Sequence, residues 1–128
     1  MTVDLQMLVW SAALALAQMV VAAIGAHGQV GLPALAGNRE DLPALTGWAG
    51  RARRAHLNMI ENLLVFAIVV LVAHAAGKAN ATTAQGASLF FWARLAYAIL
   101  YVAGVPWLRT AAWAASIAGL LLVFSQLF

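Results

Sequence analysis

The sequence predicts an all-α integral membrane protein, a four-helix bundle whose helices run up-down-up-down through the bilayer. Of its 128 residues, 65% are hydrophobic and only 9% are charged, whereas an ordinary soluble domain is about half apolar and about a quarter charged. The apolar residues gather in four stretches of about the 20 residues that span a bilayer. A soluble fold of this length could not bury so much apolar surface, so the excess must face lipid.

The chain reads as a single domain, residues 1–128, with helices expected at 3–24, 51–76, 85–103 and 107–128. The first stretch carries Asp4 and no Lys or Arg at its start, so we interpret it as a retained helix and not as a signal peptide. His27 to Gly50 is broken by glycines and prolines and holds the charged run 38–41, which predicts a loop. Its length makes this loop a candidate lid or binding loop.

The remaining boundaries follow from local signals. A run of arginines opens the second helix, and a polar turn from Gly77 to Ala84 follows that helix. Gly104-Val105-Pro106 ends the third helix, because proline cannot continue it. The absence of cysteine excludes disulfides and thiolate ligands. The basic balance, seven Lys and Arg against four Asp and Glu, contains no long basic run, so we expect no nucleic-acid partner. His74 has no partner at metal-ligand spacing, so we also expect no metal.

The distribution of basic residues predicts the orientation. The first and third connections, with the helix ends beside them, carry Arg39, Arg51, Arg53, Arg54 and Arg109. The second connection carries only Lys78, so the positive-inside rule places connections one and three in the cytoplasm and both termini in the periplasm. Asn80-Ala81-Thr82 matches a glycosylation sequon, but nothing else indicates a eukaryotic source. We therefore read that match as chance and expect a bacterial inner membrane.

Two of the predicted helices each carry one polar stripe. At about 100° per residue, the polar residues of the second helix fall within an arc of roughly 100°, and those of the third within roughly 60°. The first stripe consists of Arg51, Arg54, Asn58, Glu61 and Asn62, and the second of Arg94, Tyr97 and Tyr101. His56 and Arg53 point elsewhere on the second helix.

Glu61 and Arg94 stand at matching depths. Glu61 lies ten residues in from Arg51, and Arg94 lies ten residues before Gly104, which places both about 15 Å deep at 1.5 Å per residue. A charge there costs at least about 2.5–3.5 kcal/mol on insertion scales. We therefore predict a buried ion pair between Glu61 and Arg94 that faces the bundle interior.

The polar neighbours of this pair predict a binding cavity open to the cytoplasm. Arg54 and Asn58 stand on one side of it, and Tyr97 and Tyr101 on the other. Arginine can hold a carboxylate with two hydrogen bonds, and Glu61 can accept from a ligand ammonium group. A zwitterion with extra carboxylates fits this set of side chains.

The residues that line this cavity resemble those of a known family. The string from Gly50 to Asn62, Gly-Arg-Ala-Arg-Arg-Ala-His-Leu-Asn-Met-Ile-Glu-Asn, resembles the signature of the MAPEG family, the membrane-associated proteins in eicosanoid and glutathione metabolism. Ala93 to Tyr101 resembles the third-helix motif of that family, and Arg109 the arginine that opens its fourth helix. The four-helix plan matches over the whole chain.

The resemblance implies a homotrimer with glutathione as co-substrate, bound between subunits near the cytoplasmic face. It implies that Arg109 stabilises the thiolate as the catalytic residue, and that Arg94 pairs with Glu61 as a structural support. The thiolate would attack a lipophilic electrophile or hydroperoxide that enters from the bilayer. The implied ligand-binding residues are Arg51, Arg54, Asn58, Glu61, Asn62, Tyr97 and Tyr101.

Three departures from the family pattern bear on function. Some members have Tyr where this chain has Asn62, and many have Leu-Pro where it has Leu63-Leu64. Some catalytic members carry an arginine near the end of the first helix, where this chain has only His27; its nearest arginine is Arg39, in the loop.

Three hypotheses follow. The first is a glutathione-dependent membrane transferase or peroxidase. The second is a non-catalytic member of the family that binds a lipid or a partner. The third is a small four-helix multidrug transporter, a class that places its essential carboxylate in the first helix, where this chain has only Asp4 at the edge. The identity of the electrophile stays open.

Overall fold

The computed structural model describes all 128 residues as five helices with no strand. The helices are α1 (Val3–Val30), α2 (Leu32–Ala36), α3 (Gly47–Ala75), α4 (Ala81–Ala103) and α5 (Pro106–Ser125). The four helices other than α2 are long and apolar enough to cross a membrane. The predicted fold class, an all-α membrane bundle of four spanning helices, is confirmed.

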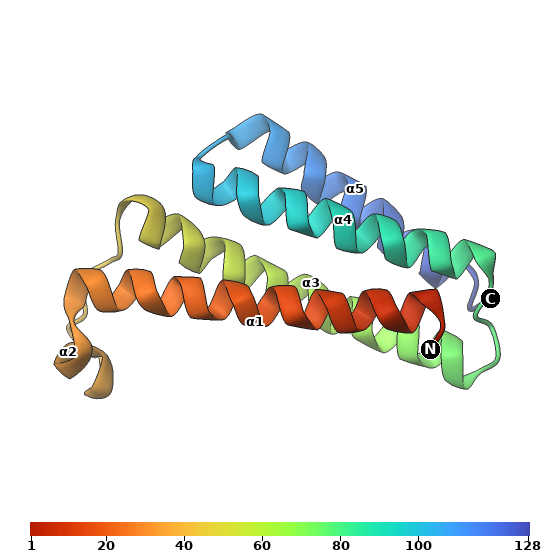
Figure 1. Cartoon of the computed structure of the whole chain (residues 1–128), viewed down its shortest axis with the longest axis horizontal. Helices are drawn as coiled ribbons and strands as arrows, with labels where there is room; N and C mark the ends of the chain where they lie inside the picture. The colour runs from red at the N-terminus through yellow and green to blue at the C-terminus, as the bar shows by residue number, and fades with distance from the viewer.

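The four long helices alternate in direction. Figure 1 shows α1 lying along α3, and α4 and α5 forming a second hairpin above them. Both termini lie at one end of the bundle together with the α3–α4 connection, which we call the terminal end. Helix α2, the loop that follows it and the α4–α5 connection lie at the opposite end, which we call the loop end.

The first connection is shorter than predicted, because helix occupies both of its ends. Helix α1 continues to Val30, past its expected end at residue 24, and α3 begins at Gly47, ahead of residue 51. Gly25 marks close helix packing instead of a helix end: a Cβ added there would lie 2.7 Å from Ala49 Cβ on α3. Gln29 then ties α1 to the start of α3, because its side chain donates to the Thr46 carbonyl at 2.7 Å and accepts from the Thr46 N–H at 3.0 Å.

Asn80, the asparagine of the sequon, caps α4. Its Oδ1 accepts hydrogen bonds from the N–H groups of Thr82 and Thr83 at 2.8 and 3.1 Å, and Thr83 Oγ1 accepts from the Asn80 N–H at 2.8 Å. This reciprocal capping box satisfies N–H groups that have no partner inside the helix. It starts α4 at Ala81, four residues ahead of the predicted start at residue 85.

The dry core lies in the half of the bundle nearest the terminal end. Phe66 of α3 stacks on Phe90 of α4 with ring centroids 3.9 Å apart, and Val123 of α5 is fully buried in the same cluster. Phe66 lies in the second half of α3 and Phe90 in the first half of α4, so both lie away from the loop end. Apolar packing therefore joins α3, α4 and α5 at one end and leaves the other end for polar side chains.

Two glycines let α4 and α5 cross closely. A Cβ on Gly119 would lie 2.6 Å from the Gly86 carbonyl oxygen and 2.7 Å from the Phe90 nitrogen, which are both backbone atoms. Small residues at helix crossings increase backbone contact in membranes, where there is no hydrophobic force between helices. Gly119 is therefore a packing residue of the fourth spanning helix.

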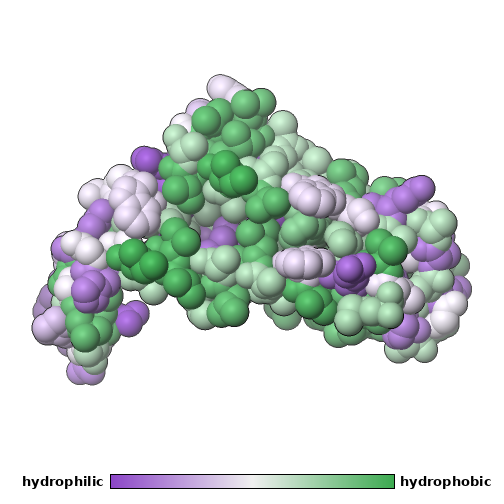
Figure 2. Space-filling view, viewed as in Figure 1, coloured by the Kyte–Doolittle hydropathy of each residue, from purple (hydrophilic) through white to green (hydrophobic).

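The outer surface is apolar. Large hydrophobic side chains are exposed along every spanning helix, among them Leu64 at 63%, Trp92 at 61% and Ile99 at 62%. Figure 2 shows apolar residues over most of the middle of the visible face, with polar residues gathered toward the two ends. This distribution is that of a surface that faces lipid.

Gly119→Ala should destabilise the protein by about 1–3 kcal/mol, because the added methyl group overlaps the α4 backbone. Gly28→Ala is the matched control, since nothing lies within 4 Å of its Cβ position. Thermal unfolding in detergent, followed by circular dichroism, measures both. Equal melting of the two variants would contradict the glycine crossing.

Candidate functional site

The side chains of the two polar stripes and Arg109 lie in the half of the bundle nearest the loop end. They come from the first half of α3, the second half of α4 and the start of α5. Helical spacing turns most members of the two polar stripes toward the seam between α3 and α4, with Glu61 as the exception. Helix α4 ends there with Gly104 in the left-handed conformation (φ 82°), and Pro106 begins α5 directly afterwards.

Arg94 is the largest of the fully buried side chains, with 1% of its surface exposed. Its Nη2 donates a hydrogen bond to Asn58 Oδ1 at 2.9 Å, and its guanidinium lies 4.2 Å from the centre of the Tyr97 ring. The ring face is electron-rich and attracts a cation. Nε and Nη1 of Arg94 are buried without a hydrogen-bond partner.

The expected ion pair between Glu61 and Arg94 is not formed within a single chain. The only hydrogen-bond partner of the Arg94 side chain is Asn58, and the Glu61 side chain is exposed. Three residues advance about 300° around a helix, so Glu61 lies about 60° from Asn58. That rotation turns its carboxylate out of the α3–α4 seam. A pair between the two residues in an assembled oligomer stays a prediction.

Asn62 supports Asn58 from the next turn of α3. Its Nδ2 donates to Asn58 Oδ1 at 3.2 Å and to the Asn58 carbonyl at 2.8 Å. The Asn58 oxygen therefore accepts from both Asn62 and Arg94. Its own NH₂ group donates to no protein atom and is free to meet a ligand.

Two further arginines contact Tyr101. Its hydroxyl accepts from Arg54 Nε at 3.3 Å, and the Arg109 guanidinium lies 4.2 Å from its ring centre. Tyr97 meets the Tyr101 ring edge-on, with centroids 5.5 Å apart. Arginines of α3 and α5 are thus brought together on one tyrosine of α4, although they are far apart in the sequence.

Arg51 has a structural partner in the chain. Its Nε donates to the Val102 carbonyl at 2.9 Å and so satisfies one of the carbonyl groups left unpaired at the end of α4. Helix α3 is thereby tied to the α4–α5 turn that carries Arg109 into the site. Ligand binding by Arg51 stays a prediction.

The seam is strongly cationic. Arg54, Arg94 and Arg109 contribute three positive charges, and no carboxylate hydrogen-bonds to any of them. Such a cluster attracts anions, and arginine in particular binds carboxylates. No three His, Asp or Glu side chains lie close enough together to hold a metal ion.

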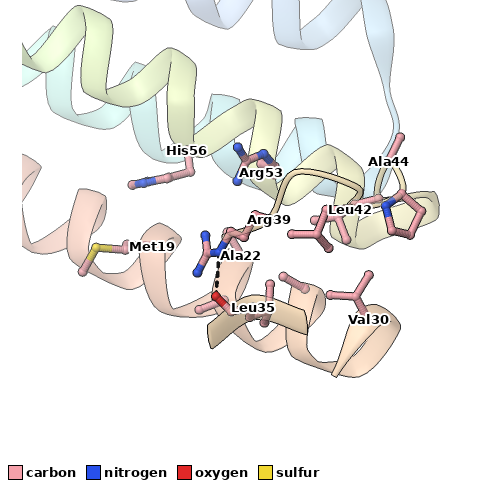
Figure 3. A pocket seen from close by; sticks show the side chains of 13 residues that line it. Met19, Ala22, Val30, Leu35, Arg39, Leu42, Ala44, Arg53 and His56 are labelled. Carbon is pink, nitrogen blue, oxygen red and sulfur yellow. Dashed lines mark hydrogen bonds between the residues drawn. The ribbon is translucent and has the colours of Figure 1, made fainter. Parts of the chain in front are cut away.

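The sequence pattern does not indicate that Arg39, Arg53 and His56 form a group. The last two point away from the polar stripe, as their spacing predicts. They line a cavity on the α1 side of α3 together with Arg39 from the loop (Figure 3). The i, i+3 spacing of Arg53 and His56 was the one local signal; the approach of Arg39 depends on the path of the loop.

A sequence model of the MAPEG family matches residues 7–128, nearly the whole chain. No curated protein and no solved structure matches it.

Asn58→Ala should destabilise the protein by about 1.5–3 kcal/mol, because it removes the hydrogen bond to the buried charge of Arg94. Gln85→Ala is the control, since this exposed α4 side chain makes no hydrogen bond within the chain. Unfolding by a denaturing detergent would compare the two. Unfolding of Asn58→Ala at the same detergent concentration as the wild type would show that Arg94 does not depend on this amide.

Proposed function

The chain belongs to the MAPEG family of membrane proteins of glutathione and eicosanoid metabolism, and on that premise we propose that it is a glutathione-dependent membrane transferase or peroxidase. Its second substrate is a lipophilic electrophile or hydroperoxide that reaches the site through the bilayer. The convergence of Arg54 and Arg109 on Tyr101 is the observation that carries this proposal.

The cation cluster suits the charges of glutathione. The peptide carries two carboxylates, one ammonium group and a thiol. Arg54 can pair with a carboxylate through its free guanidinium nitrogens, and the NH₂ group of Asn58 can donate to a peptide carbonyl. The exposed carboxylate of Glu61 can accept from the ammonium group. Tyr97 and Tyr101 would contact the peptide from α4.

Arg109 is the proposed catalytic residue. It opens the first turn of α5 beside Tyr101, so its charge lies at the edge of the cation cluster. A neighbouring cation favours the thiolate over the thiol, and the thiolate is the nucleophile. In the transferase reaction the sulfur forms a bond to an electrophilic carbon of the second substrate, and the leaving group departs with the electron pair of the bond that breaks.

A homotrimer with the site between subunits completes the proposal. Two features of the single chain support it: Nε and Nη1 of Arg94 lack partners, and the Glu61 carboxylate faces outward. A neighbouring subunit or the bound peptide can supply hydrogen-bond and charge partners for these groups. Such unsatisfied groups are costly in a membrane protein.

A non-catalytic, ligand-binding member of the family is the second candidate. It is favoured by the absence of any arginine from α1, where some catalytic members carry one; His27, exposed near the end of α1, is the basic residue there. The transporter hypothesis has less support. Asp4, the carboxylate of α1, is buried at the terminal end and accepts a hydrogen bond from Thr83 Oγ1 at 3.4 Å.

Glutathione added to the purified protein in detergent should produce a thiolate absorbance at neutral pH. Arg109→Ala should keep the fold and lose this signal, and Arg54→Gln should weaken binding about tenfold or more, because a charged hydrogen bond is worth about 1.5–3 kcal/mol. Lys78→Gln, at the terminal end, is the charge-matched control. Binding without thiolate would favour the non-catalytic candidate, and no binding at all would reject glutathione.

Glu61→Gln tests whether the site lies within one chain or is completed when the subunits assemble. If Glu61 pairs with Arg94 in the assembled protein, the variant should lower thermal stability and weaken the oligomer, because it leaves a buried charge uncompensated. Cross-linking and melting in mild detergent measure both effects. An unchanged trimer with unchanged melting would reject the pair.

We also propose an inner-membrane location in a bacterium, with the loop end in the cytoplasm and the termini in the periplasm. The support is the concentration of arginine at the loop end. The chain has no cysteine, so single cysteines can report the orientation. In intact cells a membrane-impermeant thiol reagent should label Lys78→Cys and leave Glu40→Cys unlabelled; the reverse pattern would invert the topology.

A further inference from the structure

A groove opens between α1 and α4 in the half of the bundle nearest the loop end. Its volume is about 470 Å³, and Figure 1 shows α1 and α4 diverging toward that end. Four residues of α1, five of α4 and one of α3 line it. Its two walls include Leu14, Gln18 and Val21 of α1 and Leu95, Ile99 and Val102 of α4.

This groove is distinct from the two cationic sites. Ile99 is turned by about 160° from Tyr101 around α4, at about 100° per residue. No residue of the Arg94 and Tyr101 seam lines the groove, and neither does any residue of the cavity beside Arg53. Ile99 has 62% of its surface exposed, so the groove opens onto the outer, apolar surface of the chain.

The lining of the groove is apolar and uncharged. Nine of its ten residues are hydrophobic, and none is charged. Ala52 of α3 and Ala98 of α4 are buried in it, and their small side chains leave the space between the helices open. The volume lies within the range of about 300–1,000 Å³ that is typical of ligand pockets. A charged head group finds no partner here, so the walls suit an uncharged alkyl chain.

Gln18 is the one polar residue of the groove. It lies 12 residues before the end of α1 at Val30, which corresponds to about 18 Å and places it near the middle of a hydrocarbon core of about 30 Å. Its Oε1 is buried without a hydrogen-bond partner, and its NH₂ group donates to no protein atom. An amide left unpaired in hydrocarbon is costly. A ligand that brings a hydrogen-bonding group to this depth would remove that cost.

A hydroxyl group has the chemistry that the Gln18 amide lacks. It can accept from an NH₂ group and donate to an amide oxygen, because it carries one donor and two lone pairs. Ordinary acyl chains have no polar group near the middle of the bilayer, and lipid head groups lie at its surface.

We propose that the groove binds an uncharged lipid whose alkyl chain carries a hydroxyl group part-way along its length. The hydroxyl group hydrogen-bonds to the Gln18 amide, and the chain packs against Leu14, Val21 and Ile99. This site lies outside the seam proposed to bind glutathione, and its occupation does not depend on that peptide.

Native mass spectrometry from a neutral detergent, without glutathione, tests this proposal. Methyl ricinoleate and methyl oleate are matched probes, because both are uncharged and they differ only in a mid-chain hydroxyl group. Methyl ricinoleate should bind with one site per chain and about threefold or more tightly, the factor expected for one hydrogen bond inside a membrane. Equal affinity of the two esters would overturn the hydroxyl contact, and binding of neither ester to the intact oligomer would overturn the site.

Gln18→Leu should lower the affinity for methyl ricinoleate to that for methyl oleate and leave methyl oleate unaffected. The variant should fold, because leucine inserts favourably into the membrane. Gln6→Leu is the matched control, since Gln6 is exposed on the first turn of α1 and does not line the groove. Ala17→Phe, which fills the groove from an exposed position, should weaken the binding of both esters. A preference for methyl ricinoleate that persists in Gln18→Leu, or an equal loss in Gln6→Leu, would reject the site.

Discussion

The buried guanidinium of Arg94 is the constraint on which the loop end of the bundle depends. A charge this deep between membrane helices has no water to solvate it and must find its partners inside the protein. It finds the amide oxygen of Asn58 on α3 and the ring face of Tyr97 on its own helix. Those contacts set how α3 meets α4. They therefore set where Tyr101 stands relative to the arginines of α3 and α5.

Different interactions hold the helices together at the two ends of the bundle. At the terminal end, the stacked rings of Phe66 and Phe90 and the glycine crossing of α4 with α5 pack without polar groups. Dry packing of this kind defines the helix positions and tolerates little change in volume. At the loop end, the same helices carry charged and aromatic side chains instead. The buried apolar cluster therefore lies away from the cationic seam.

Two adjacent arginines of α3 face two different surfaces of the protein. Arg54 turns toward Tyr101 and the seam with α4, and Arg53, rotated by about 100°, turns toward α1 and the loop. The start of α3 thus supplies one cation to the seam with Tyr101 and another to the cavity beside α1. Arg51, the third arginine of this start, fastens α3 to the end of α4. The three arginines at the start of α3 therefore contact three different parts of the structure.

The sequence by itself determined the membrane class, the number of spans and the two polar stripes. Hydrophobic length and helical periodicity are local properties, and the arginine and tyrosine spacings of α3 and α4 follow from them. Tertiary structure decided which polar groups meet within one chain: Asn58 reaches Arg94 and Glu61 does not, because a rotation of about 60° on one helix separates a side chain in the seam from an exposed one. It also decided that Gly25 is a packing site within a longer α1, and that the loop brings Arg39 beside Arg53. Those outcomes depend on how two surfaces fit together, and no single stretch of sequence contains that fit.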